Sequence, residues 1–186
     1  MNEKPILFNS EMVNAILSGR KTQTRRIISE KALHLFGVAA SSGECHPIEL
    51  CDQRSQSYYL DFCPLGKPGD QLWVREAFAA GLCTESTLAY RATHKPEDLE
   101  EGWGETIKWT PSIHMPRWAS RINLLITGVR VERLNTISTG DAMAEGYPVE
   151  REATGGSLDA WLWFRELWDG IYPDNTFEVN PWCWVI

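Results

Sequence analysis

The segment Ser18-Gly-Arg-Lys-Thr-Gln-Thr-Arg-Arg26 joins a helical pattern to the strand expected after it. Upstream, apolar residues recur at the spacing of one helix face: Met12, Val13, Ile16 and Leu17. This spacing predicts a helix over residues 10–18. Gly19 can take the left-handed conformation that closes a last helical turn, so we expect the helix to end there. The polar, β-branched residues that follow predict a strand over residues 22–28.

Lys21 falls in the junction between this helix and this strand, and Thr24 falls on the strand. In a regular strand, residues three apart point to opposite faces, so the two side chains can meet only where the chain bends. The junction supplies that bend. A structural interpretation competes with this one, because Arg and Lys at a solvated helix end also offset the helix dipole.

Composition and charge limit the class of protein. The chain has 186 residues, of which 43% are hydrophobic, enough for one sizeable core, and we expect one domain of the α+β class. The formal net charge of −7 repels polyanions, so any nucleic-acid contact requires a local basic surface. The charge favours a pocket for a small, uncharged ligand over a groove.

The N-terminal residues and the cysteines indicate the compartment. Glu3 and Lys4 precede an apolar run too short for a signal peptide or a membrane span, so we expect a soluble, cytoplasmic protein without membrane contact. The five cysteines are Cys45, Cys51, Cys63, Cys83 and Cys183. Their odd number and irregular spacing predict reduced thiols.

Further along the chain, alternation predicts strands over residues 5–8, 72–77, 87–92, 122–134 and 181–186. Thr127-Gly128 interrupts the longest of these, as a bulge or a barrel corner would. Helices are expected over residues 138–146 and 157–168. Residues 94–106 read as an exposed loop. Residues 29–67 have poor periodicity and read as an inserted loop region with one helical turn over 31–36.

Within this insertion, Cys45-His46, Cys51 and Cys63 suggest a zinc site, since thiolates and imidazoles are the usual ligands. The gaps of five and eleven residues between the cysteines differ from the close pairs of structural zinc sites. We therefore expect neither a metal nor another cofactor.

Two stretches outside the basic segment carry binding candidates. Residues 109–121 place Trp109, His114, Arg117 and Trp118 around two prolines, and such a stretch can stack a base and contact a phosphate. The structural alternatives are a loop held by its tryptophans and a histidine with a packing role. Glu145 is expected in the last turn of the 138–146 helix, where the helix dipole disfavours ionisation, as a proton donor requires.

The basic segment resembles the signature of the ASCH family, a branch of the PUA-like superfamily. The pattern Gly-(Arg/Lys)-Lys-Thr-x-Thr-x-Arg is matched by Gly19, Arg20, Lys21, Thr22, Thr24 and Arg26. Further features follow in the family's order: Gly69-Asp70, residues 122–134, Ala142-Met-Ala-Glu145 and Trp182–Ile186. The resemblance implies one domain over residues 1–186, a small, mixed PUA-like β-barrel flanked by short helices. The length is closer to that of ASCH proteins of phages and prophages.

The resemblance also implies an activity. Small bacterial N4-acetylcytidine amidohydrolases of this family use a Lys, a Thr and a Glu that match Lys21, Thr24 and Glu145. The chemistry agrees, since removing an acyl group from an amine needs a base, a nucleophile and an acid. Lys21, Thr24 and Glu145 can fill these three roles in the order given. The pKa of Lys21 must then fall, and burial and nearby Arg side chains favour this.

The same resemblance proposes binding residues. Arg20, Thr22 and Arg26 belong to the motif, and Arg26 can hold an oxyanion or a base carbonyl. In PUA-like barrels the strand after the Gly-Asp turn helps to line the cleft, which makes Trp73, Arg75 and Glu76 candidates. Packing of Trp73 in the core is the structural alternative.

Two other functions remain open. A binding module could grip a modified nucleotide or single-stranded RNA, with Lys21 and Arg26 on phosphate and Trp109 or Trp118 on a base. A ribonuclease that uses the same residues lies between this module and the amidohydrolase. The third possibility is an interaction protein with an empty cleft.

Overall fold

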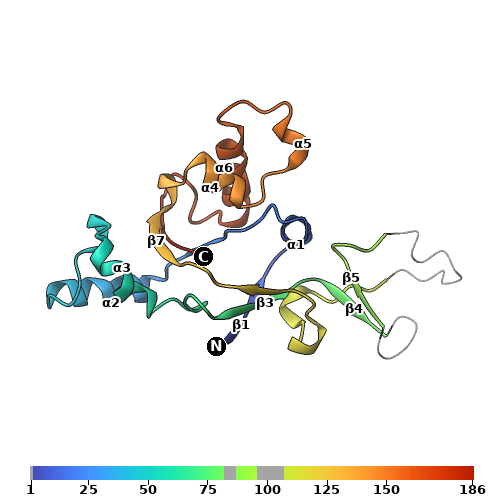
Figure 1. Ribbon diagram of the computed structural model, residues 1–186, viewed down its shortest axis with the longest axis horizontal. Helices are drawn as coiled ribbons and strands as arrows, with labels where there is room; N and C mark the ends of the chain where they lie inside the picture. Colours follow the sequence, from blue (N-terminus) through green and yellow to red (C-terminus); the bar gives the residue numbers. More distant parts are fainter. Residues whose placement is uncertain (1, 82–86, 96–106) are drawn as a thin grey trace, which may run out of the picture.

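The computed structural model describes residues 2–81, 87–95 and 107–186, and Figure 1 shows their arrangement. At its centre, strand β8 (Trp182–Val185) pairs antiparallel with β2 (Arg25–Ile27) on one side and β7 (Arg130–Arg133) on the other. Trp182 and Trp184 pack into one core cluster, and Cys183 packs into another. The unbroken apolar sequence of β8 is what a strand covered on both faces requires.

A second sheet holds β3 (Gln71–Arg75) between β1 (Glu3–Leu7), which is parallel to it, and β6 (Asn123–Leu125), which is antiparallel. Helix α1 (Ser10–Leu17) packs on this sheet through Val13, which meets Leu72 and Val74. The predicted inward direction of Leu72 and Val74 is confirmed.

A third, two-stranded sheet of β4 (Phe78–Ala80) and β5 (Leu88–Tyr90) lies at the opposite end of the molecule from the helices of residues 30–60 (Figure 1). The sequence had indicated β5 but not β4. The short helices η3 (Ser112–His114) and η4 (Arg117–Ala119) lie beside it, and Met115 packs on Phe78. Residues 96–106 of the expected loop lie outside the described residues.

The prediction of a loop region over residues 29–67 was wrong. This segment forms α2 (Glu30–Ser41), η1 (Ile48–Leu50) and α3 (Gln53–Leu60). Phe36 and Tyr59 bury against Trp184 of the central strand. The helical period was obscured because α2 exposes further apolar residues, such as Val38, on its outer side.

The expected strand over residues 122–134 is divided between two sheets. β6 ends at Leu125 in one sheet, and β7 begins at Arg130 in the other. The interruption predicted at Thr127-Gly128 is the connection between them. It places the two sheets next to each other with a cleft at the turn.

The C-terminal part forms η5 (Leu134–Thr136), α4 (Thr139–Ala144), α5 (Val149–Glu152) and α6 (Asp159–Ile171), which cover one face of the central sheet. Ser138 caps α4 in a capping box with Asp141. Gly146 follows with a φ of 109°. Glu145 therefore occupies the end of a well-defined short helix, as predicted.

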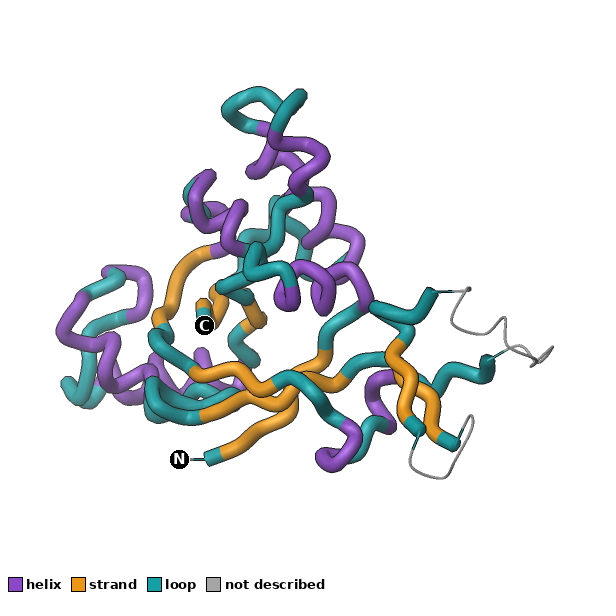
Figure 2. The backbone as a smooth tube through the Cα atoms, turned by 45° about the vertical axis from the view of Figure 1, so that its right-hand side comes forward, coloured by secondary structure: helices purple, strands orange, loops and turns teal. Residues whose placement is uncertain are grey.

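The protein belongs to the α+β class. Figure 2 shows the helices gathered around the strands, and among the described residues the strands form three separate sheets, none of which closes on itself. Nor does any helix in the described part of the chain have both the length and the apolar character needed to cross a bilayer.

Candidate functional site

The basic segment is tied to three parts of the fold. Gly19 has a φ of 74°, and after it the backbone N–H groups of Arg20 and Lys21 both bond to Ala15 O. The N–H of Thr22 then bonds to Ala144 O at the end of α4, at 2.8 Å. Thr24 pairs with Ile186 in both directions before β2 begins. The expected bend therefore exists. β2 is shorter than predicted because the backbone of residues 22–24 is hydrogen-bonded to Ala144 and Ile186 outside the regular strand.

Lys21 and Glu145 form a buried ion pair. The Lys21 Nζ lies 2.8 Å from Glu145 Oε2, and their side chains are 3% and 5% exposed. The same ammonium donates to Glu145 O and to Gln23 O, both at 2.9 Å. All three of its N–H groups are thereby used. The amine and the carboxyl predicted to meet are in direct contact.

Arg25 holds the second oxygen of this carboxylate. Its Nη1 donates to Glu145 Oε1 at 3.0 Å, and its Nη2 lies 3.1 Å from Glu132 Oε2 and 3.6 Å from Asp141 Oδ2. The Arg25 side chain is only 1% exposed. Glu145 therefore bonds two cations, whereas the sequence had suggested a proton donor whose ionisation the helix dipole disfavours.

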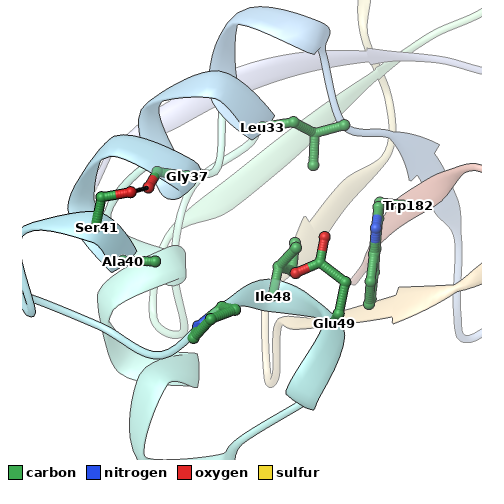
Figure 3. A pocket seen from close by; sticks show the side chains of 8 residues that line it. Leu33, Gly37, Ala40, Ser41, Ile48, Glu49 and Trp182 are labelled. Carbon is green, nitrogen blue, oxygen red and sulfur yellow. Dashed lines mark hydrogen bonds between the residues drawn. The ribbon is translucent and has the colours of Figure 1, made fainter.

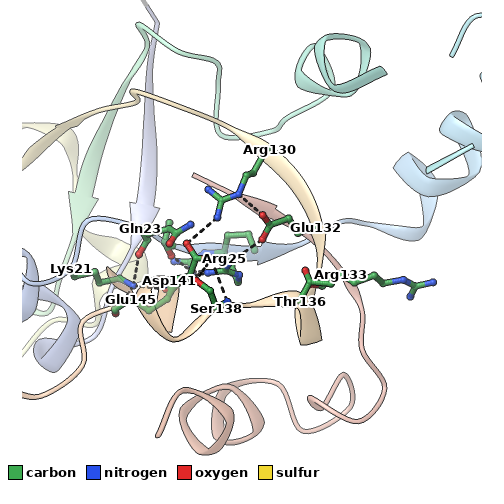
Figure 4. Close-up of polar contacts among 12 residues, drawn as sticks. Lys21, Gln23, Arg25, Arg130, Glu132, Arg133, Thr136, Ser138, Asp141 and Glu145 are labelled. Atoms are coloured by element: carbon green, nitrogen blue, oxygen red, sulfur yellow. Dashed lines mark hydrogen bonds and ion pairs between the residues drawn. The ribbon is translucent and has the colours of Figure 1, made fainter. Parts of the chain in front are cut away.

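Half-buried side chains extend this network toward the surface of the protein (Figure 4). Arg130 bonds both Glu132 and Asp141. The Gln23 amide fits between Asp141, to which it donates at 3.0 Å, and Arg130, from which it accepts at 2.7 Å. Lys21, Arg25 and Arg130 oppose Glu132, Asp141 and Glu145, so the network is balanced in formal charge.

Thr24 is buried beside this network and bonds to Arg26. Arg26 Nη1 donates to Thr24 Oγ1 at 2.9 Å, and Arg26 Nη2 donates to Leu7 O at 3.1 Å. The guanidinium also lies over the Phe8 ring, 5.3 Å from its centroid. Because Arg26 can only donate, it leaves the Thr24 hydroxyl proton available to another acceptor.

Lys21 and Thr24 line a cleft of about 360 Å³ between the two larger sheets. Thr22, Gln23 and Thr127 also line it, and its other walls are mostly apolar: Ile6, Phe8, Ile16, Leu72, Leu124, Leu125, Ile126 and Ile186. Glu145 does not line this cleft: it borders a smaller cavity of about 20 Å³, which Lys21 and Thr24 share, and a separate cavity of about 450 Å³ beside Arg20. The carboxylate therefore lies behind Lys21 as seen from the cleft.

The pKa of Lys21 is lowered. Burial is the main cause, and the cations of Arg26 and Arg25 add to it, whereas Glu145 raises the pKa and opposes them. The direction predicted from the sequence is confirmed, and burial, Arg25 and Arg26 are among the causes expected, but Arg20, which was also expected to contribute, is not one of them. A lysine in this setting loses its proton at a lower pH than an exposed one.

The remaining member of the basic motif faces away from the cleft. Arg20 Nη1 donates to Gly146 O at 3.2 Å and to Tyr147 O at 3.0 Å. These bonds fasten the junction to the end of α4. Arg20 borders a separate cavity of about 450 Å³, between α1 and α6.

The candidates on and after β3 are not brought to the cleft. Alternation places Leu72 on the cleft side, so Trp73 and Arg75 project from the other face of the strand. There the guanidiniums of Arg75 and Arg117 lie 5.4 Å and 5.8 Å from the Trp73 ring centroid. Arg117 also pairs with Glu3.

The other candidates are distributed over the same end of the molecule. Glu76 is 2% exposed and bonds Arg121 through both oxygens. The rings of Trp109 and His94 are 5.4 Å apart, whereas His114 and Trp118 are exposed. None of these described side chains borders the cleft lined by Lys21 and Thr24.

Of the cysteines of residues 29–67, Cys63 and Cys45 pack among the helices of that segment, whereas Cys51 is exposed. Cys45, Cys51 and Cys63 are free thiols, as is Cys183, while Cys83 lies outside the described residues. The His46 Nδ1 lies 3.0 Å from Ser55 Oγ. Within residues 2–81, 87–95 and 107–186, no three His, Cys, Asp or Glu side chains form a group that could hold a metal ion. A cavity of about 450 Å³ lies nearby, between α2, η1 and Trp182 (Figure 3).

Arg25, Glu132 and Asp141 belong to the site but were not among the predicted residues. Arg25 stands in the basic segment and was expected only as a nearby cation, whereas Glu132 and Asp141 carry no local signal and reach the site only through the fold. Comparison with protein-family models, curated proteins and solved structures gives no match. Function is therefore argued from the geometry of the Lys21, Thr24 and Glu145 site.

Proposed function

We propose that this protein is an amidohydrolase that removes the acyl group from an N4-acylated cytidine nucleoside or nucleotide. The observation that carries the proposal is the buried contact of 2.8 Å between Lys21 Nζ and Glu145 Oε2, beside a cleft that Lys21 and Thr24 line together. The cleft volume of about 360 Å³ suits a small organic ligand. Its mostly apolar walls suit an uncharged acylated base.

The nucleophile in this proposal is Thr24. Its Oγ1 attacks the acyl carbon, and its proton passes to the amine of Lys21. The hydrogen bond from Arg26 at 2.9 Å stabilises the negative charge that develops on Oγ1. Burial lowers the pKa of Lys21, which supports its role as the base.

Glu145 acts in this scheme through Lys21. Once Lys21 has lost one proton to solvent, its neutral amine stays hydrogen-bonded to Glu145 Oε2, 2.8 Å away, which orients it. The amine accepts the Thr24 proton and then delivers a proton to the departing N4 nitrogen. The C–N4 bond breaks, cytidine leaves and the acyl group remains on Thr24.

The direct test is incubation with N4-acetylcytidine and chromatographic detection of cytidine. We expect turnover by the wild-type protein and its loss in Lys21→Ala and Thr24→Val. Lys31→Ala is the matched control, because Lys31 is an exposed lysine on α2, outside the cleft lining. Absence of cytidine with the wild-type protein, or unchanged turnover in Lys21→Ala, would rule out the proposal.

One observation favours a second function, the binding of single-stranded RNA or a modified nucleotide. Trp118 is 68% exposed, and near it Arg75 and Arg117 flank Trp73 on the outer side of β3. Exposed aromatic and arginine side chains can stack bases and contact phosphates. Salt separates the two functions, because phosphate contacts weaken steeply with ionic strength and turnover of an uncharged nucleoside does not.

The ASCH resemblance supports the same site. Lys21, Thr24 and Glu145 are the positions that match the amidohydrolases of that family, and they adjoin one another in this fold. We accordingly propose a PUA-like arrangement in which the sheets of β1 and β8 correspond to the parts of the family's barrel. A crystal structure that superposes these two sheets on a PUA-like barrel, strand for strand, is the check.

A further inference from the structure

A cavity of about 20 Å³ lies behind the cleft, between the basic segment and helix α6. Lys21, Thr24, Arg25, Arg26 and Glu145 form its polar wall, and buried side chains of α6, Phe164 and Trp168, form the apolar wall opposite. Lys21 and Thr24 line both this cavity and the cleft. The cavity therefore adjoins the proposed acyl site across these two side chains.

Arg25 lines this cavity, and one of its buried N–H groups has no acceptor in the described part of the protein. The two terminal nitrogens of Arg25 bond carboxylates, but its buried Nε has no hydrogen-bond partner among the described protein atoms. A buried donor without an acceptor is destabilising. A small acceptor is therefore expected next to Arg25 Nε.

Size and chemistry identify this acceptor as water. A buried water needs roughly 10–15 Å³ and two to four polar partners. The cavity of about 20 Å³ admits one water and excludes an organic ligand. Arg25 Nε can donate to this water, the carboxylate oxygens of Glu145 retain further acceptor capacity, and the Thr24 hydroxyl can donate.

We propose that this cavity binds one water molecule and that this water hydrolyses the acyl ester on Thr24. The proposal rests on the proposed amidohydrolase function. A substrate that fills the mostly apolar cleft excludes solvent there, so the second step needs water from the polar side of Thr24. The cavity lies on that side, next to the base Lys21.

The chemistry of this step balances. The water oxygen bonds to the acyl carbon, the bond from that carbon to Thr24 Oγ1 breaks, and a carboxylic acid is released. Lys21 takes one proton from the water and returns it to Oγ1, which restores the hydroxyl. Glu145 keeps the amine in place through the contact of 2.8 Å.

The site itself is tested by a crystal structure of the wild-type protein at a resolution that shows ordered water. We expect density for one water within hydrogen-bond distance of Arg25 Nε. Absence of such density, with the surrounding side chains well ordered, would overturn the site whether or not the protein is an amidohydrolase.

The role of the water is tested with Leu167→Phe, which enlarges a half-buried side chain that borders the cavity. We expect the acyl–Thr24 ester to accumulate, detected by mass spectrometry of the Thr24 peptide, and steady-state turnover to fall by about tenfold or more. Leu162→Phe is the matched control, because Leu162 is an exposed residue of the same helix that does not border the cavity.

Arg25→Lys provides a second variant, because it retains the positive charge but removes the Nε–H donor. Accumulation of the ester in this variant also supports the proposal. If the wild-type protein is active and both variants release the acyl group at the wild-type rate, the inference falls and the amidohydrolase function stands. A wild-type protein without turnover rejects the function itself.

Discussion

At the residue scale, the site depends on charges that the fold removes from water. Lys21, Arg25 and Glu145 have side chains that are 3%, 1% and 5% exposed. Taking ions out of water costs several kcal/mol each, and good geometry among the partners must offset that cost. The two oxygens of Glu145 bond two different cations, which fixes the carboxylate. The arrangement restricts Lys21 to one position at the edge of the cleft.

The lowered pKa of Lys21 predicts the pH dependence of the activity. As the free enzyme's base, Lys21 must be neutral, so kcat/KM rises as the pH passes upward through its pKa. Because burial lowers that pKa, the ascending limb should lie below the range of an ordinary lysine. A profile of kcat/KM for N4-acetylcytidine against pH measures its midpoint. A limb near the ordinary lysine range would contradict the assignment of Lys21 as the base.

Two substitutions should move this limb in opposite directions. Arg26→Gln removes a cation that lowers the pKa of Lys21, so the limb should shift to higher pH. Glu145→Gln removes the carboxylate that raises this pKa, so the limb should shift to lower pH. Both variants should have a lower maximal kcat/KM. The pH at the midpoint of the ascending limb does not depend on that maximum. Shifts in the same direction, or none, would show that another group titrates.

At the element scale, the end of α4 is pressed against the basic segment. Gly146 makes this possible, since a Cβ there would lie 3.0 Å from Ala15 Cβ and 3.3 Å from Lys21 Cβ. Its φ of 109° is also one that other residues rarely adopt. The sequence predicted that the helix ends at Gly146. It did not predict the close contact of Gly146 with α1, which depends on the tertiary structure.

Gly146→Ala should therefore be more harmful than an ordinary glycine substitution. We expect about 1–2 kcal/mol from the unfavourable φ and a further 1–3 kcal/mol from overpacking, measured by chemical denaturation. Activity should fall as well, because Lys21 is displaced. Gly43→Ala is the matched control, with a φ of 79° and no atom within 4 Å of its added Cβ. Equal losses of stability would contradict the close packing at Gly146.

The sequence anticipated the parts of the site that depend on neighbouring residues. The stop at Gly19, the bend between Lys21 and Thr24, and the helix that ends at Glu145 follow from local rules. The partners of Arg25 come from β7 and α4, about a hundred residues away, and local patterns do not encode such pairings. Trp73 was misplaced because the alternation of a strand does not reveal which face meets the cleft.

At the scale of the whole molecule, the central strand β8 connects the site to the segment 29–67. Trp184 packs against Phe36 with the ring centroids 6.1 Å apart, and Cys183 packs with the helices on the other side. Directly after this strand, the backbone of Ile186 pairs with that of Thr24. The helices of residues 29–67 thus belong to the core that supports the site, and we expect the chain to unfold as one cooperative unit.

Phe36→Ala tests this view of the molecule. The ring of Phe36 is 1% exposed and contacts Tyr59, Phe62 and Trp184, so its removal should cost about 3–5 kcal/mol of unfolding free energy. Val38→Ala, at a residue of the same helix that is 54% exposed, should change stability by no more than about 0.5 kcal/mol. Denaturant titration followed by tryptophan fluorescence and by circular dichroism measures both. A small effect of Phe36→Ala, or separate transitions in the two signals, would mean that the segment folds apart from the site.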